Sequence, residues 1–211
     1  MLPEFHIACF LFTCLGVFFA INSFNILRTR QSRKGKTIEV YAEVKRPGGF
    51  LFALAAFGTL FFFLLAIAYA FLIFTGLFQL VQYFPLQLRF QHDSWVQVIG
   101  IALETVGYLL FLWSVLERGR YATSWEMHEN HKLVTWGPYR YVRHPSYLAY
   151  FLMFFGLFFL LLNLVALVPL VAIPGYVSLT TYEEQLLIAR FGNEYVEYQR
   201  RTGRFLPKIK R

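Results

Sequence analysis

The sequence predicts an all-α integral membrane protein with about five transmembrane helices. Of its 211 residues, 57% are hydrophobic and only 15% are charged, which is the composition of a membrane protein rather than a soluble one. Three apolar runs, at residues 5–27, 50–80 and 95–117, are each long enough to cross about 30 Å of hydrocarbon as a helix. A fourth apolar region covers residues 147–182 and exceeds the length of one ordinary span.

The fourth apolar region is predicted to fold into a helical hairpin. Asn163 lies near its centre, and two prolines follow. We interpret the region as two short helices, at residues 147–162 and 164–182, with the turn near Asn163. A loop at residues 119–146 precedes the hairpin, and a cytoplasmic segment at residues 183–211 follows it.

The basic residues predict the orientation, because Lys and Arg in short loops stay on the cytoplasmic side. The loop "RTRQSRKGKTIEVYAEVKR" after the first span is strongly basic, whereas the loop after the second span has only Arg89. The loop after the third span and the C-terminal tail are basic again. The N-terminus is therefore expected outside, and the first and third loops and the C-terminus in the cytoplasm. The region between the third loop and the tail must then cross twice, as a hairpin does.

Charge and cysteine positions exclude several classes of function. The formal net charge of +8 lies mostly in loops close to the predicted spans, which suits anionic lipid headgroups rather than nucleic acid. Cys9 and Cys14 have backbones roughly 8 Å apart on a helix, too far for an unstrained disulfide. No zinc-site spacing occurs, so we expect no metal. With no internal repeat either, residues 1–211 are expected to form one membrane domain.

The usual soluble cofactor and hydrolase motifs are absent. The sequence contains no G-x-G-x-x-G, Walker, H-E-x-x-H or G-x-S-x-G pattern. Its polar residues concentrate instead in the third loop and directly after the hairpin. Because a hairpin brings its two ends together, we expect these two regions to form one cytoplasmic site.

The stretch "GPYRYVRHPSYLAY" carries the first half of this site. Pro145 suits the first turn of a helix and favours an extended conformation at His144. Such a helix start directs free N–H groups and a positive dipole end at the loop, where Arg143 also lies, and this arrangement binds carboxylates or phosphates. The alternative is a capped helix start with Tyr and Arg anchors at the membrane surface.

The second half is the acidic pair Glu183 and Glu184. Neighbouring residues on a helix point about 100° apart, so the two carboxylates are not expected to share a role. We assign Glu183 to the site and expect Glu184 to meet solvent or Arg190.

The segment "HKLVTWGPYRYVRHPSYLAY", followed after the hairpin by "YEEQLLIARFGNEYVEYQRRTGRFLP", resembles the isoprenylcysteine carboxyl methyltransferase family, which is related to the phospholipid methyltransferases. The resemblance implies a membrane enzyme that binds S-adenosylmethionine at the cytoplasmic face without a Rossmann domain. The cofactor-binding residues that it implies are His131, Lys132, Leu133, Val134, Tyr139, His144, Pro145, Ser146, Tyr147 and Glu183.

This cradle suits the chemistry of S-adenosylmethionine. A helix N-terminus beside Arg and His suits its carboxylate, while a glutamate and aromatic faces suit its amine and sulfonium. A carboxylate that accepts the methyl group needs no general base. The protein then has to align donor and acceptor and exclude water.

The acceptor is expected to be a lipophilic molecule from the bilayer, with a prenylcysteine-type carboxylate. The resemblance implies an arginine shortly before the glutamate pair that holds this carboxylate, but Leu179 and two threonines occupy that region here. We assign the role to Arg201 and Arg204 in the tail. A phospholipid amine and a small thiol remain alternatives, and for an amine Glu104 is a candidate base, unless it is an interhelical hydrogen-bond partner.

Two other classes of function remain open. Sterol reductases share a similar hairpin and Arg-His-Pro-like motif, which makes an NADPH-dependent membrane reductase one alternative. A non-enzymatic membrane protein on the same scaffold is the other. The short chain and its Glu-Glu and Phe-Gly-x-x-Tyr ending favour the methyltransferase, and the oligomeric state is left open.

Overall fold

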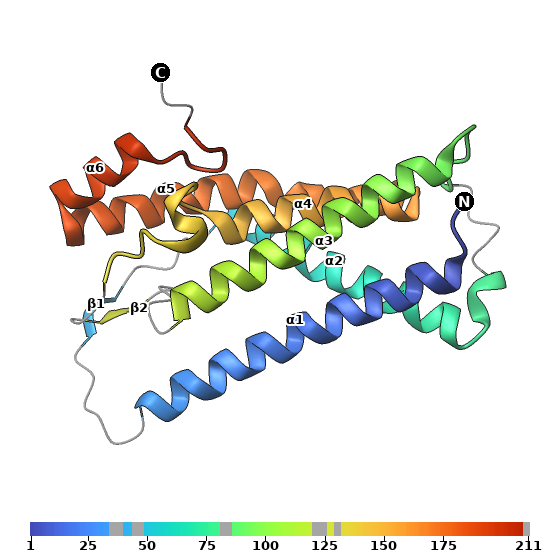
Figure 1. Cartoon of the computed structure of the whole chain (residues 1–211), viewed down its shortest axis with the longest axis horizontal. Coiled ribbons are helices and arrows are strands. Elements are labelled where there is room, and N and C mark those ends of the chain that lie inside the picture. The colour runs from blue at the N-terminus through green and yellow to red at the C-terminus, as the bar shows by residue number, and fades with distance from the viewer. Residues whose placement is uncertain (34–39, 44–48, 81–85, 120–125, 129–131, 209–211) are drawn as a thin grey trace.

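The computed structural model describes residues 1–33, 40–43, 49–80, 86–119, 126–128 and 132–208 (Figure 1). In this part of the chain, four helical segments are long and apolar enough to cross a membrane. They are α1 (Glu4–Arg33), α2 (Phe50–Phe74), α3 (Asp93–Arg118) and the segment Leu164–Phe191. The fifth, α4 (Pro145–Leu161), is a shorter apolar helix. The predicted multi-pass, helical membrane fold is confirmed.

The second predicted span is shorter than its apolar run. We expected one helix over residues 50–80, but α2 ends at Phe74, and a separate 3-10 turn, η1, covers Leu77–Leu80. Gly76 lies between them with a φ of 71°, a left-handed conformation that glycine adopts without a steric cost. The glycine therefore ends the helix although the hydrophobic run continues.

The helical hairpin is confirmed, and its turn is held from outside. Leu162 ends α4 with a φ of 50°, and the Asn163 side chain accepts a hydrogen bond of 2.9 Å from the Val165 amide. The strand-like segment 86–88 pairs with this turn through Leu88 N to Leu162 O at 2.7 Å and Leu164 N to Leu86 O at 3.0 Å. These bonds give partners to backbone groups of the turn that lie outside the regular helices.

The returning half of the hairpin has two parts. The 3-10 helix η4 (Leu164–Val171) contains Pro169, and the α-helix α5 (Ala172–Phe191) continues from it. α5 therefore runs beyond the predicted limit of residue 182 and carries the glutamate pair on its last turns. A short helix, α6 (Asn193–Arg201), follows after Gly192.

Close packing of α3 against α4 depends on three glycines. A Cβ atom on Gly100 would lie 2.5 Å from the Leu160 nitrogen, and one on Gly107 would lie 2.7 Å from Met153 Cγ. A Cβ on Gly156 would lie 2.8 Å from Glu104 Cγ. Glu104 is completely buried, and its carboxylate oxygens have no hydrogen-bond partner among the described residues. The interhelical hydrogen bond that we considered for Glu104 is thus not observed in the described structure.

A small antiparallel sheet departs from the all-helical prediction. Strand β1 (Val40–Glu43) lies in the loop after α1, and strand β2 (Glu126–His128) lies in the loop after α3. Backbone pairing of these strands requires the two loops to lie at the same end of the bundle. The N-terminus lies at the opposite end (Figure 1).

Candidate functional site

A cavity lies where the end of α3, the start of α4, the end of α5 and α6 meet. The loop residues before α4 and the last turns of α5 face one another there, as the hairpin prediction required. Its lining residues are Arg118, Leu133, Val134, Tyr139, Arg143, His144, Pro145, Ser146, Tyr147, Glu183, Leu187, Tyr195 and Tyr198.

The start of α4 has the predicted form. Pro145 occupies the first turn, and His144 is the residue that caps the helix, with a φ of −123°. The His144 side chain makes no capping bond to the helix. Its ring instead lies parallel to the Tyr147 ring, with centroids 5.8 Å apart.

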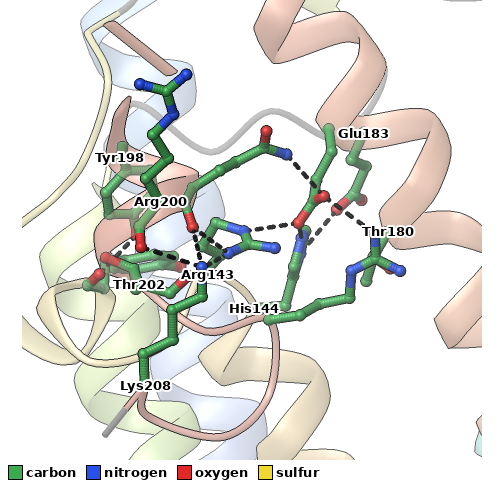
Figure 2. A network of polar contacts seen from close by, with 12 residues as sticks. Arg143, His144, Thr180, Glu183, Tyr198, Arg200, Thr202 and Lys208 are labelled. Carbon is green, nitrogen blue, oxygen red and sulfur yellow. Dashed lines mark hydrogen bonds and ion pairs between the residues drawn. The ribbon is translucent and has the colours of Figure 1, made fainter. Parts of the chain in front are cut away.

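Both ring nitrogens of His144 contact carboxylates on α5. The Nδ1 atom lies 3.4 Å from Glu183 Oε2, and the Nε2 atom lies 3.1 Å from Glu184 Oε1. Figure 2 shows the His144 side chain directed toward Glu183, with Arg143 beside it. Both neighbouring glutamates therefore contact one imidazole, because its two nitrogens point in different directions. Of the two, Glu183 lines the cavity and Glu184 does not.

Glu184 does not meet solvent, which corrects its predicted position. Its side chain is only 6% exposed, and Oε1 accepts from Arg143 Nε at 2.8 Å as well as facing His144. Oε2 accepts from Gln199 Nε2 at 2.9 Å and from Arg204 Nη2 at 3.1 Å. With both oxygens engaged, Glu184 has a structural role behind the cavity wall. Glu183 remains as the acidic group on the cavity wall.

Arg143 is likewise committed to the structure. Its Nη1 atom donates to the carbonyl of Gln199 at 3.3 Å and to the carbonyl of Thr202. The charged pair Arg143–Glu184 therefore joins the loop before α4 to α5, and the bonds of Arg143 to the two carbonyls join it to α6 and the segment after α6.

The glutamate pair changes the protonation of His144. Burial alone would lower the pKa of its imidazole, but the hydrogen bonds to Glu183 and Glu184 outweigh burial and raise the pKa above its ordinary value of 6.5. Both ring nitrogens donate hydrogen bonds only when the ring is protonated. The geometry therefore favours an imidazolium between two carboxylates.

We expect the stabilisation by His144 to decline as the pH rises. A histidine whose pKa is raised by folding stabilises fully below its unfolded pKa and loses this contribution as the pH rises through its folded pKa. The difference in unfolding free energy between wild type and His144→Gln should be largest below about pH 6.5 and smaller at about pH 9. Thermal unfolding in detergent at both pH values measures this difference. A difference that does not change with pH would contradict the prediction.

Arg118 is a cavity residue that the sequence analysis did not single out. Its Nε atom is buried and has no hydrogen-bond partner in the described part of the chain. The Tyr139 hydroxyl is also buried and has no partner there. The Arg118 guanidinium is within electrostatic range of Tyr139 and Glu183. In the sequence Arg118 looks like an ordinary basic residue at a membrane boundary, so no local signal distinguishes it.

Aromatic residues complete the walls. The Tyr147 hydroxyl donates to Glu183 Oε1, and the centroids of the Tyr147 and Tyr176 rings lie 4.7 Å apart. The Tyr198 hydroxyl donates to the Tyr139 carbonyl at 2.6 Å. Tyr195 is buried beside it, and the Phe-Gly-x-x-Tyr pattern noted in the sequence ends at this residue.

The structure brings most of the expected cofactor residues together. Leu133, Val134, Tyr139, Glu183 and the run His144–Tyr147 line the cavity, whereas Lys132 is exposed and does not. His131 lies outside the described residues.

The two arginines assigned to the substrate do not line the cavity. Arg201 is 77% exposed and lies 3.5 Å from Glu197 on the outer face of α6. Arg204 pairs with Glu184 behind the cavity wall. Their positions suit neither residue to direct contact with a ligand in the cavity.

Comparison with known proteins agrees with the motifs. Residues 95–194 match a family model described as phospholipid methyltransferase. The protein-S-isoprenylcysteine O-methyltransferase of Tribolium castaneum is 32% identical over 127 residues, which is 54% of this chain and 43% of that protein. The human protein of that name is 33% identical over 122 residues, 56% of this chain and 43% of that protein. Protein-S-isoprenylcysteine O-methyltransferase B of Arabidopsis thaliana is 29% identical over 120 residues, 54% of this chain and 61% of that protein.

A solved structure of the eukaryotic intramembrane Ras methyltransferase ICMT is 25% identical, with a TM-score of 0.48. The matched region covers 74% of this chain and 52% of the chain in the solved structure. The match to the Tribolium castaneum and human proteins spans less than half of their length, 43% in both cases. The predicted resemblance to the isoprenylcysteine carboxyl methyltransferases is confirmed.

Proposed function

We propose that this chain, which is similar to isoprenylcysteine carboxyl methyltransferases, is an integral membrane methyltransferase. It uses S-adenosylmethionine and acts on a lipophilic acceptor with a prenylcysteine-type carboxylate. The observation that carries the proposal is one cavity with an acidic wall at Glu183 and a half-buried arginine, Arg118, whose buried Nε lacks a partner among the described residues. Such a cavity offers contacts to a cationic donor and an anionic acceptor together.

The residues present fit the cofactor by chemistry. Glu183 is an acid for its amine, the tyrosine rings are faces for its sulfonium, and the amide groups at the start of α4 suit its carboxylate. When bound, S-adenosylmethionine supplies a methyl group already activated by the sulfonium. The cavity residues that we propose to hold it are Leu133, Val134, Tyr139, His144, Pro145, Ser146, Tyr147 and Glu183. For His131 and Lys132 the proposal rests on the sequence resemblance alone.

The protein's own task is then to orient groups and to exclude water. The Tyr147 hydroxyl and the His144 ring fix the Glu183 carboxylate from two sides. The centroid of the Phe205 ring lies 6.1 Å from that of His144 and 5.1 Å from that of Phe151. The segment after α6 therefore packs against His144.

We propose that Arg118 holds the acceptor carboxylate, in place of Arg201 and Arg204. Arg143 and Arg204 are engaged with Glu184, while Arg201 lies on an exposed face. Arg118 is also within electrostatic range of Tyr147 and Tyr150 on the apolar helix α4. An anionic group at Arg118 is therefore compatible with an apolar tail that extends toward the bundle.

A phospholipid amine methyltransferase is the second candidate, because the family model of that description matches residues 95–194. A neutral amine has to lose a proton, and Glu104 is not among the residues that line the cavity. This favours the carboxylate acceptor. Methyl transfer from labelled S-adenosylmethionine to a prenylcysteine analogue, a phosphatidylethanolamine and a small thiol separates the acceptors, and turnover of the lipid alone would overturn our choice.

We expect His144→Ala and Glu183→Ala each to weaken binding of S-adenosylhomocysteine by about ten- to a hundredfold. Loss of a charged hydrogen-bond partner costs about 1.5 to 3 kcal/mol, which corresponds to this range. Calorimetry on purified protein measures it, with NADPH as a second ligand to test the reductase alternative. Glu197→Ala, on the exposed face of α6, is the matched control. Unchanged affinity in both folded variants would remove these residues from the site.

We also propose that the cavity end and the C-terminus face the cytoplasm, supported by the basic loops and by the pairing of β1 with β2. In a variant with Cys9 and Cys14 replaced, single cysteines at Gly35, Gln91 and Arg200 test this. A membrane-impermeant thiol reagent should label Gln91→Cys from the opposite side to the other two. Labelling of all three from one side would contradict the topology.

A further inference from the structure

The segment after α6 docks along the loop that precedes α4. Val142 and Gly203 form a parallel bridge, and the Arg143 amide donates to the Gly203 carbonyl at 2.8 Å. The His144 amide donates to the Arg204 carbonyl at 3.1 Å. The backbone of Arg204 is thus bonded directly to the backbone of His144.

A tight turn fixes the direction of this segment. A Cβ atom on Gly203 would lie 1.6 Å from the Leu206 carbonyl oxygen, a distance that no side chain permits. Only glycine fits this conformation. Arg204 follows directly, and its backbone is held by the bond from the His144 amide, so the side chain reaches Glu184 on α5 from a fixed backbone position.

The Arg204 side chain acts on the carboxylate that contacts His144. Its Nη2 atom lies 3.1 Å from Glu184 Oε2, while Glu184 Oε1 faces His144 Nε2 at 3.1 Å. Among the described residues, Arg204 is the cation on Oε2, and the other partner of that oxygen is the neutral amide of Gln199. Arg204 therefore helps to hold the Glu184 carboxylate in its rotation, together with Gln199 on Oε2 and Arg143 on Oε1, and this rotation sets the contact at Nε2.

We infer that Arg204 is a positioning residue, which fixes the His144 imidazole through Glu184 and through the backbone bond between them. The consequence for cofactor affinity rests on the proposed function, but the orientation of the ring does not. Arg204 makes one contact, from Nη2 to one carboxylate oxygen, and such a contact requires a cation but not a planar guanidinium. We therefore expect lysine to substitute for arginine here.

The test is a ¹⁵N-histidine NMR spectrum of the protein without ligand, combined with calorimetry against S-adenosylhomocysteine. The chain has five histidines, and His144→Gln identifies the signals of interest. We expect Arg204→Ala to shift or broaden the Nε2 signal of His144, with a smaller change at Nδ1, and to weaken binding about tenfold. Arg204→Lys should restore both. Arg200→Ala removes an exposed arginine four residues away and should change neither.

The outcomes separate the inference from the proposed function. An unchanged Nε2 signal in Arg204→Ala, or an equal effect of Arg200→Ala, overturns the inference. A changed Nε2 signal with unchanged affinity supports the positioning of His144 but removes His144 from the cofactor site. Should Arg204→Ala fail to fold, Arg204→Gln keeps a donor without the charge. In that variant, a wild-type Nε2 signal would likewise overturn the need for a cation.

Discussion

Arg118→Gln is expected to lower kcat/KM for a prenylcysteine-type carboxylate by about a hundredfold or more, while affinity for S-adenosylhomocysteine stays within about threefold. The reason is that glutamine keeps an N–H donor near the position of the arginine Nε but is shorter and removes the charge that we propose for the acceptor carboxylate. Loss of one member of a desolvated charge pair costs about 2 to 5 kcal/mol. Single-turnover methylation and calorimetry on the same preparation measure the two quantities.

The comparison of acceptors makes this result specific. Arg118→Lys should retain part of the activity, because it keeps the charge without the planar guanidinium. Arg200→Ala, which removes an exposed arginine of α6, should behave as wild type. If Arg118→Gln weakens cofactor binding as much as turnover, Arg118 holds the carboxylate of the cofactor instead. If it changes neither, Arg118 has no role in the reaction.

Glu184→Ala is expected to lower the free energy of unfolding by about 3 to 5 kcal/mol, the typical cost of removing one partner from a buried ion pair. Its Oε1 accepts from Arg143, whose side chain is only 9% exposed and would be left without its carboxylate. Chemical unfolding in detergent, followed by tryptophan fluorescence, measures the loss. The effect on stability should exceed that of Glu183→Ala, because Glu183 is 25% exposed and borders the cavity.

Glu197→Ala is the matched control for this experiment. Glu197 also pairs with an arginine, Arg201, but both side chains are largely exposed, at 64% and 77%. An exposed pair of this kind contributes about 0 to 1 kcal/mol. Equal loss of stability in Glu184→Ala and Glu197→Ala would show that the buried network does not stabilise the protein.

Much of the fold follows from local properties of the sequence. Hydrophobic runs of sufficient length locate α1, α2 and α3, since a helix must satisfy its own backbone groups in hydrocarbon. Asn163 within the fourth run locates the hairpin turn, and Pro145 locates the start of α4. The end of α2 was missed because hydrophobicity continued past Gly76, where the backbone adopts a left-handed conformation.

The composition of the site depends on contacts between distant segments. The motifs identified the run His144–Tyr147 and Glu183 because these residues lie close to the hairpin ends in the chain. Arg118 escaped notice because it enters the cavity from the far end of a different helix. Arg204 was assigned a substrate role because the sequence shows a basic tail. The sequence does not show that this tail docks beside α5, where Arg204 contacts Glu184.

The sequence by itself determined the membrane class, the approximate positions of the apolar helices, and the two segments that meet at the site. Only the tertiary structure decided which side chains face the cavity and which are enclosed behind it. A step of one residue on a helix turns a side chain by about 100°, so the roles of Glu183 and Glu184 depend on how α5 is rotated. That rotation is set by the packing of α5 against α2 and by the contacts of α5 with the loop before α4 and the segment after α6, which no local pattern encodes.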